Sequence, residues 1–198
     1  MNSKTELNKE GDAQKALLIV PLSYGYIHSR DILPAVEERA LDAAARLYFE
    51  HSSEERRIAM GFAVNCPKEL PKKIAYLTNL GVQEKHILAS PTPLSNIITE
   101  GQTIRGVVII NDIIADTVIL VVHGDCLMRA RYIFSKLFPG SKIVVEKIVG
   151  EFEKDIPYKL MRNKFIHRAA NFIYYCGIRI LGLERMKRYS HPEHGDKQ

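Results

Sequence analysis

The stretch ILVVHGDCLMRARYIF, residues 119–134, places a histidine, an aspartate, a cysteine and an arginine close together. Cys126 would lie in the first turn of a helix, where the positive end of the helix dipole lowers the pKa of a thiol. His123, at the end of the preceding strand, could act as its base. Asp125 opposes thiolate formation, and a buried cysteine is usually inert. The stretch therefore allows a thiol-dependent hydrolase or transferase that uses Cys126 and His123, without requiring one.

Arg129 offers a second kind of chemistry at the same turn. Helical side chains lean toward the N-terminus, so its guanidinium can reach back over the turn and meet an anion together with the helix amides. The alternative is an ion pair with Asp125 four residues earlier. Asp125 is also well suited to cap the helix through its side-chain oxygen. The sequence thus predicts either an anion-binding turn or a well-capped helix start.

The elements around this turn alternate along the chain. Strands are expected at residues 15–22, 56–64, 86–90, 117–123 and 142–148, and helices at 35–51, 68–82 and 125–138. The stretch 95–115 is ambiguous, because GVVIINDII favours a strand at 106–110 while the whole stretch has the length of a helix. Strands that alternate with helices predict an α/β fold: a Rossmann-like three-layer sandwich with a mainly parallel sheet of about five strands.

Ligands of such sheets lie beyond the carboxyl ends of the strands. That rule selects four loops as the sides of one pocket, and a carboxylate from Glu100 could join them if the preceding loop folds over the sheet. GxGxxG and GxxxxGK[ST] are both missing from these loops, so no dinucleotide fingerprint or P-loop is present. The candidate ligand-binding residues are Ser23, Gly25, Gly61, Asn96, Glu100, His123, Gly124, Asp125 and Arg129.

The chain is expected to form one domain over residues 15–150, preceded by a disordered N-terminus over 1–14 and followed by a basic helical extension over 151–198 that packs on the same domain. From Lys154 on, ten Lys and Arg stand against four Asp and Glu, whereas the part before is close to neutral. This distribution argues against a nucleic-acid-binding surface spread over the fold. Residues 156–188 could instead meet a membrane surface or a second copy of the chain.

Composition limits the remaining choices. The three cysteines, Cys66, Cys126 and Cys176, are odd in number and widely spaced, so reduced thiols are the simplest interpretation. Outside the tail HPEHGD, residues 191–196, no spacing suits a metal, and no metal site is expected. The opening MNSKTELNKEGDAQK lacks the apolar core of a signal peptide, which predicts a cytoplasmic protein, peripheral on a membrane if the extension binds one.

Three segments in order, ERALDAAARLYFE, KKIAYLTNLGVQEKHIL and VILVVHGDCLMRARYIFSKLFPG, resemble the SanA/ElyC/YdcF-like family of α/β proteins over residues 15–150. Arg129 and Ala130 match the family's arginine and alanine, while Cys126 stands where the family has histidine. Glu100 in SNIITEG is the equivalent of the family's glutamate, and Asn96 is one position out of register.

The resemblance implies a Rossmann-like domain, a helix over most of 95–115 and a pocket for a nucleotide-like or phosphorylated ligand. S-adenosylmethionine or a nucleotide is the cofactor type that it suggests. Several members of the family are tied to cell-envelope maintenance, and a defined reaction is generally lacking. The predicted function is therefore the binding of a small molecule, with thiol chemistry and an interaction through the basic extension as alternatives.

Overall fold

A computed structural model describes residues 15–52, 57–64, 66–93, 96–150, 152 and 163–189. They form an α/β fold with one five-stranded parallel sheet, as the alternating pattern predicts. The expectations for residues 1–14 and for the tail 191–196 lie outside the described part. The strands are β1 (Lys15–Pro21), β2 (Arg57–Val64), β3 (Ile87–Pro93), β4 (Ile114–His123) and β5 (Lys142–Ile148). The helices are α1 (Ala35–His51), α2 (Glu69–Asn79), α3 (Ile97–Ile110), α4 (Leu127–Leu137), α5 (Lys164–Leu181) and α6 (Leu183–Tyr189), with short 3-10 turns η1 (Glu84–His86) and η2 (Gly124–Cys126).

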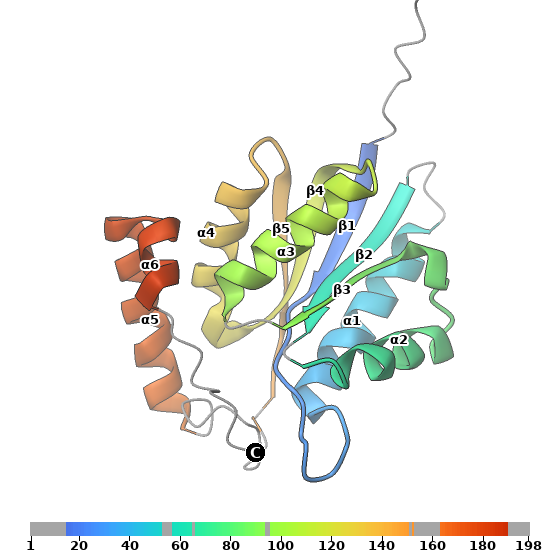
Figure 1. Cartoon of the computed structure of the whole chain (residues 1–198), viewed down its shortest axis with the longest axis horizontal. Helices are drawn as coiled ribbons and strands as arrows, with labels where there is room; N and C mark the ends of the chain where they lie inside the picture. Colours follow the sequence, from blue (N-terminus) through green and yellow to red (C-terminus); the bar gives the residue numbers. More distant parts are fainter. Residues whose placement is uncertain are drawn as a thin grey trace, which may run out of the picture.

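The strand order is β3-β2-β1-β4-β5, and every pair is parallel. The chain runs outward from β1 to β3, crosses back to β4 and ends at β5. The order therefore reverses between β1 and β4, and this is the place where doubly wound sheets leave a crevice at their carboxyl edge. In Figure 1, α3 and α4 cover one face of the sheet, and α1 and α2 cover the other.

The two middle strands are apolar because both of their faces are covered. Leu17, Leu18, Ile19 and Val20 in β1 are fully buried, as are Val118 and Leu120 in β4. A strand that is buried on both faces needs a continuous apolar run rather than alternation, which explains KALLIVP and TVILVV. β5 forms one edge of the sheet and is only partly buried over most of its length, and its lysines Lys142 and Lys147 are exposed.

The ambiguous stretch is helical, as the resemblance implies, and its β-branched residues are packed within α3. Asn96 starts the helix: its side chain accepts from the backbone N–H groups of Ile98 and Thr99, and the Thr99 hydroxyl accepts from the Asn96 N–H. This reciprocal cap satisfies amides that a helix start otherwise leaves free. Ile98 and Ile104 are then buried against the sheet. Local strand propensity at 106–110 is thus overridden by capping and packing.

The C-terminal extension forms a further layer outside the sandwich (Figure 1). α5 packs against α4 and η2, and α6 packs against α3, so the two helices lie on other helices rather than on the sheet. Gly182, at φ 80°, separates them. Of the helices that the structure describes, none has the length and apolarity needed to cross a membrane.

Candidate functional site

Three helices begin at the carboxyl edge of the sheet with a glutamate in the first turn. Glu37 lies in α1, Glu69 in α2 and Glu100 in α3. A carboxylate is favoured there because the helix N-terminus carries partial positive charge. All three side chains are buried and converge near Lys73, and we refer to Ser23, Glu37, Glu69, Lys73 and Glu100 as the buried charge cluster.

Close polar contacts hold this cluster together. Lys73 Nζ lies 2.8 Å from Glu37 Oε1 and 2.7 Å from Glu69 Oε1. The Ser23 hydroxyl donates to Glu69 Oε1 at 2.7 Å and accepts from Lys73 Nζ at 3.0 Å. The Ser23 backbone N–H donates to Glu100 Oε1 at 2.8 Å. The loop after β1 is thereby tied to the starts of α1, α2 and α3.

Burial shifts the pKa values of the groups in the cluster, which holds three glutamates and one lysine. Burial raises the pKa of Glu37 to about 7 and that of Glu100 to about 8, against the partial compensation from Lys73. Burial alone would lower the pKa of Lys73, but the carboxylates of Glu37 and Glu69 outweigh it and raise that pKa. Lys73 is therefore a protonated counter-ion, and it is no general base for Ser23.

Aromatic side chains fill the crevice at the carboxyl ends of β1 and β4. Tyr24 is buried, and its hydroxyl oxygen accepts from the His123 backbone N–H at 2.5 Å. The ring of Phe152 lies 6.0 Å from that of Tyr24, 4.6 Å from that of His123 and 5.0 Å from that of His167. The crevice at the reversal of strand order is thus closed by the protein's own residues.

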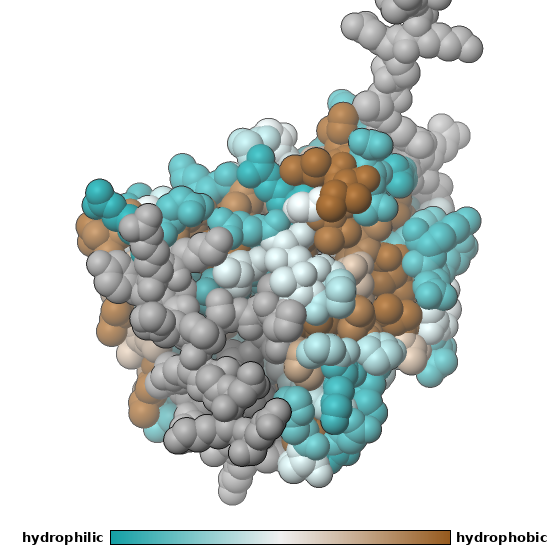
Figure 2. All heavy atoms as spheres, viewed as in Figure 1, coloured by the Kyte–Doolittle hydropathy of each residue, from teal (hydrophilic) through white to brown (hydrophobic). Residues whose placement is uncertain are grey.

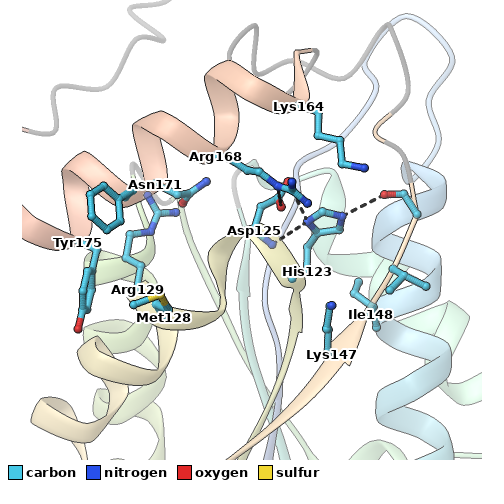
Figure 3. Close-up of a pocket in the computed structure, with 14 residues that line it drawn as sticks. His123, Asp125, Met128, Arg129, Lys147, Ile148, Lys164, Arg168, Asn171 and Tyr175 are labelled. Carbon is cyan, nitrogen blue, oxygen red and sulfur yellow. Dashed lines mark hydrogen bonds and ion pairs between the residues drawn. The ribbon is translucent and has the colours of Figure 1, made fainter.

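An open cavity with a volume of about 360 Å³ lies beside these aromatic side chains, toward β5 and α5. Four basic side chains line it: Arg129 from α4, Lys147 from β5, and Lys164 and Arg168 from α5. Figure 3 shows Lys164 reaching down from α5 and Lys147 reaching up from β5 on either side of the His123 ring. We call this the basic cavity. Its remaining lining residues are His123, Gly124, Asp125, Met128, Ile148, Val149, Gly150, Asn171, Phe172 and Tyr175.

Asp125 is the one carboxylate among the residues that line the basic cavity. Its Oδ1 accepts from Arg168 Nε at 2.7 Å, and its Oδ2 lies 3.6 Å from His167 Nδ1. Partial burial would raise the pKa of Asp125, but the hydrogen bond and charge of Arg168 hold it below its ordinary value. Asp125 is therefore a carboxylate bound to α5. The prediction that it caps the helix is wrong: η2 precedes α4, and no side chain caps α4.

His123 takes the capping role instead. Its Nδ1 accepts from the Asp125 backbone N–H at 3.3 Å, so the neutral ring carries its proton on Nε2. That nitrogen lies 3.0 Å from the Gly150 carbonyl oxygen, to which it donates. Nδ1 thus caps η2, while Nε2 joins the end of β4 to the segment after β5.

Arg129 is held by an aromatic ring rather than by the carboxylate four residues before it. Its guanidinium carbon lies 5.1 Å from the centre of the Tyr174 ring, and its buried Nε has no hydrogen-bond partner within the described chain. The ion pair with Asp125, the alternative that the sequence left open, does not form, and Arg168 pairs with that carboxylate instead. Arg129 keeps donor capacity at the wall of the cavity.

Cys126 is buried, and burial raises the pKa of its thiol, opposite to the lowering expected for a helix start. Its sulfur lies 3.8 Å from Nε2 of His167 rather than next to the His123 ring. Burial also disfavours the charged form of His167 and so lowers its pKa, which makes this histidine neutral near pH 7. Cys126 is not among the residues that line the basic cavity.

The structure divides the predicted site residues between two places. His123, Gly124, Asp125 and Arg129 line the basic cavity, as expected from their position after β4. Ser23 and Glu100 meet each other, but within the buried charge cluster. The expectation of one pocket shared by all four loops is therefore wrong.

The other predicted residues have structural roles. Gly25 follows Tyr24 at φ 98°, a conformation that favours glycine. Gly61 lies within β2, where an added Cβ would come within 3.1 Å of Ile104 and Leu18. Asn96 caps α3.

Several residues of the buried charge cluster and of the basic cavity were not predicted from the sequence. Lys73 had a visible signal, since it lies four residues after Glu69 and on the same side of α2 as the apolar Leu70, Ile74 and Leu77. Lys164 and Arg168 are also four residues apart, but their meeting with β5 is a tertiary contact that no local pattern reveals.

Comparison with known proteins finds no family model, no curated protein and no solved structure that this chain matches. The likeness to the SanA/ElyC/YdcF-like family thus stays a prediction that depends on the quoted segments. In the described part of the chain, no group of three or more His, Cys, Asp or Glu side chains could hold a metal ion. Only the geometry and the charges of the cavity therefore indicate a function.

Proposed function

We propose that this protein binds a small phosphorylated molecule in the basic cavity. The observation that carries the proposal is the convergence of four basic side chains from three separate elements on one concave volume. Like charges repel, so a folded chain gains nothing by gathering them unless anions are present. Arginine and lysine donors at the start of a helix are suited to a phosphate group.

The shape and the apolar wall of the cavity narrow the ligand class. A volume of about 360 Å³ lies within the range of small-molecule sites, roughly 300 to 1,000 Å³, and is far larger than a lone phosphate needs. Phe172 and Tyr175 of α5 and Ile148 of β5 supply apolar surface beside the charges. A sugar ring or a nucleobase can pack there while the phosphate meets the cations. A mononucleotide or a sugar phosphate is the ligand class that we favour.

Thiol chemistry has less support from the geometry. A nucleophilic cysteine needs a depressed pKa and access to its substrate, whereas Cys126 is buried with a raised pKa. Iodoacetamide is therefore expected to modify Cys66 and Cys176, which are partly exposed, at least about ten times faster than Cys126. Peptide mapping of the labelled chain measures the three rates. Fastest labelling at Cys126 would restore the thiol hypothesis.

Thermal shift and titration calorimetry test the binding proposal, with AMP, a hexose phosphate and S-adenosylmethionine as probes. Adenosine and the free hexose serve as the unphosphorylated partners. A ligand at a hundred times its Kd stabilises the fold by about 2.7 kcal/mol, which is a shift of several degrees in Tm. We expect phosphorylated probes to raise Tm and their unphosphorylated partners to leave it unchanged. Equal shifts, or none, would refute the proposal.

Two lysines of the same strand provide a matched pair of variants. Lys147 lines the basic cavity, whereas Lys142 is exposed at the other end of β5 and does not line it. Lys147→Met is expected to weaken binding of the phosphorylated probe about tenfold, by loss of one charge-assisted contact. Lys142→Met should leave the affinity unchanged. Equal losses in both variants would show that net charge, rather than this cavity, attracts the ligand.

A further inference from the structure

The side of α5 that faces away from the rest of the fold is strongly apolar. Phe165 is 82% exposed, Ile173 70% and Ile180 80%, and Phe172 and Ile166 are more than half exposed. Figure 2 shows hydrophobic residues along the left edge of the molecule, where α5 lies in Figure 1. A patch of this kind on a single helix marks an interaction surface.

The spacing of these residues makes the patch one continuous stripe. Residues 165, 169, 172, 173, 176 and 180 recur every three or four positions, so they share one face of the helix. The opposite face, toward α4 and η2, carries the buried side chains of His167, Asn171 and Ile178. α5 thus presents apolar side chains outward while two of its three buried side chains are polar, unlike an ordinary surface helix.

Basic residues border the stripe on one flank. Lys164, Arg168 and Arg179 follow one another along the side of α5 that adjoins Phe172. The α5 sequence KFIHRAANFIYYCGIRIL contains no aspartate or glutamate. An apolar face with aromatic side chains, bordered by cations, is typical of a helix that lies in the interface of a membrane.

We infer that the outer face of α5 docks on an anionic lipid surface, with Phe165, Phe172, Ile173 and Ile180 inserted at the boundary of headgroups and acyl chains. Charge complementarity selects this occupant over a second copy of the chain. A symmetric dimer through this face would bring one acid-free, cationic helix against another. Lipid phosphates instead neutralise the basic flank while the acyl region takes up the apolar stripe.

Vesicle sedimentation of the full chain tests the inference. We expect binding to vesicles of phosphatidylcholine mixed with phosphatidylglycerol, and markedly weaker binding to phosphatidylcholine alone. Phe165 and Ile180 lie outside the lining of the basic cavity, so changing them leaves the proposed ligand site intact. Phe165→Ser combined with Ile180→Ser is expected to weaken binding to the mixed vesicles by about tenfold or more.

Matched controls separate the stripe from general surface properties. Ile110, at the end of α3, is 81% exposed, so Ile110→Ser removes similar apolar area elsewhere and should not affect sedimentation. Arg179→Gln should weaken binding to the mixed vesicles about fivefold, and Arg105→Gln on α3 should not. Each variant's helical content and Tm are measured first, and these exposed positions should leave both unchanged.

Three results would overturn the inference: unchanged vesicle binding in the Phe165→Ser/Ile180→Ser variant, equal binding to both vesicle types, or a dimer in solution that this variant dissociates. The last would assign the stripe to a second copy of the chain. Thermal shift with phosphorylated probes reports on the basic cavity by itself. Failure of the lipid inference and failure of the proposed ligand site are therefore distinguishable.

Discussion

The carboxyl edge of the sheet holds two charged regions that are built in opposite ways. In the buried charge cluster, α1, α2 and α3 each begin with a glutamate, and the charges meet inside the protein at Lys73. α4 begins with no acidic residue in its first turn and carries Arg129 there, at the wall of an open cavity. The same position in successive crossovers thus carries a buried carboxylate in one region and, in the other, an arginine at the cavity that we propose as a ligand site.

The two regions also differ in how open they are. The crevice between β1 and β4 is closed by Tyr24 and Phe152 and is bordered by the buried charge cluster. The open volume lies one strand further along, where β5 and α5 contribute lysines and an arginine. The C-terminal extension therefore supplies one wall of the candidate site rather than only covering the sandwich.

Removal of Lys73 should have the largest effect on stability. Lys73→Met leaves Glu37 and Glu69 buried without their cation, so the free energy of unfolding should fall by about 3 to 5 kcal/mol. Lys147→Met, in the exposed region, should change it by less than about 0.5 kcal/mol. Urea unfolding followed by circular dichroism compares the two. Similar losses would contradict the assignment of one lysine to stability and the other to binding.

The pH dependence of stability should come from the buried charge cluster. Glu37 and Glu100 have pKa values of about 7 and about 8 in the folded protein, above the ordinary 4.5. Between these limits the two carboxyls bind more protons in the native state than in the unfolded state, so their contribution to stability is fully present below about pH 4.5 and is lost as the pH rises to about 8.

Glu100→Gln keeps an acceptor for the Ser23 N–H and removes one of these protons. It should therefore reduce the decline in unfolding free energy by about 3 to 4 kcal/mol between about pH 5 and pH 8. Urea titrations at several pH values measure the decline. Glu84→Gln, at an exposed position, is the control and should leave it unchanged. An unaltered slope in Glu100→Gln would show that this carboxyl is ionised in the fold.

The hydrogen bond from the His123 N–H to the Tyr24 hydroxyl, at the closed crevice, should contribute to stability. Tyr24→Phe preserves the ring but leaves the buried His123 N–H without its acceptor, which should cost about 1 to 2 kcal/mol. The exposed hydroxyl of Tyr76, which donates to Asp42, gives the control Tyr76→Phe with a loss below about 0.5 kcal/mol. Chemical unfolding at one pH suffices. Equal effects would mean that the Tyr24 hydroxyl bond contributes little.

Gly124 gives the smallest effect on stability. A Cβ there would lie 2.5 Å from Cε of Lys147, a flexible side chain that can move aside. Gly124→Ala should change the unfolding free energy by less than about 1 kcal/mol. Because Lys147 is displaced, binding of a phosphorylated probe should weaken a few-fold by calorimetry. Gly106→Ala, where no atom lies within 4 Å of the added Cβ, should leave binding unchanged.

The fold was predictable because its signals are local. The strands of residues 15–21 and 142–148 have the apolar runs and turn residues of buried parallel strands, and Ala35–His51 repeats apolar residues at helical spacing. The helix at Ile97–Ile110 was ambiguous on propensity, since β-branched residues fit either structure. The capping interactions of Asn96 at its start favour the helix over a strand.

The site was predictable in part. The rule for strand ends selects His123, Gly124, Asp125 and Arg129, and the structure places all four at the lining of the cavity. The rule cannot show that the loop after β1 folds inward, because this depends on Tyr24 finding a backbone N–H about a hundred residues away. The partner of Asp125 was missed for the same reason, since Arg168 belongs to a helix that the strand pattern does not place.

The pairing of β1 with β4 has a consequence for how the chain is made. Leu17 pairs with Thr117 and Ile19 with Ile119, so the first strand lacks its central neighbour until the fourth has left the ribosome. During that interval an apolar strand has one unpaired edge, the feature that promotes aggregation of nascent chains. Contacts so distant in sequence also slow folding. The protein is therefore expected to acquire its sheet late in synthesis, as one step that follows the emergence of residue 123.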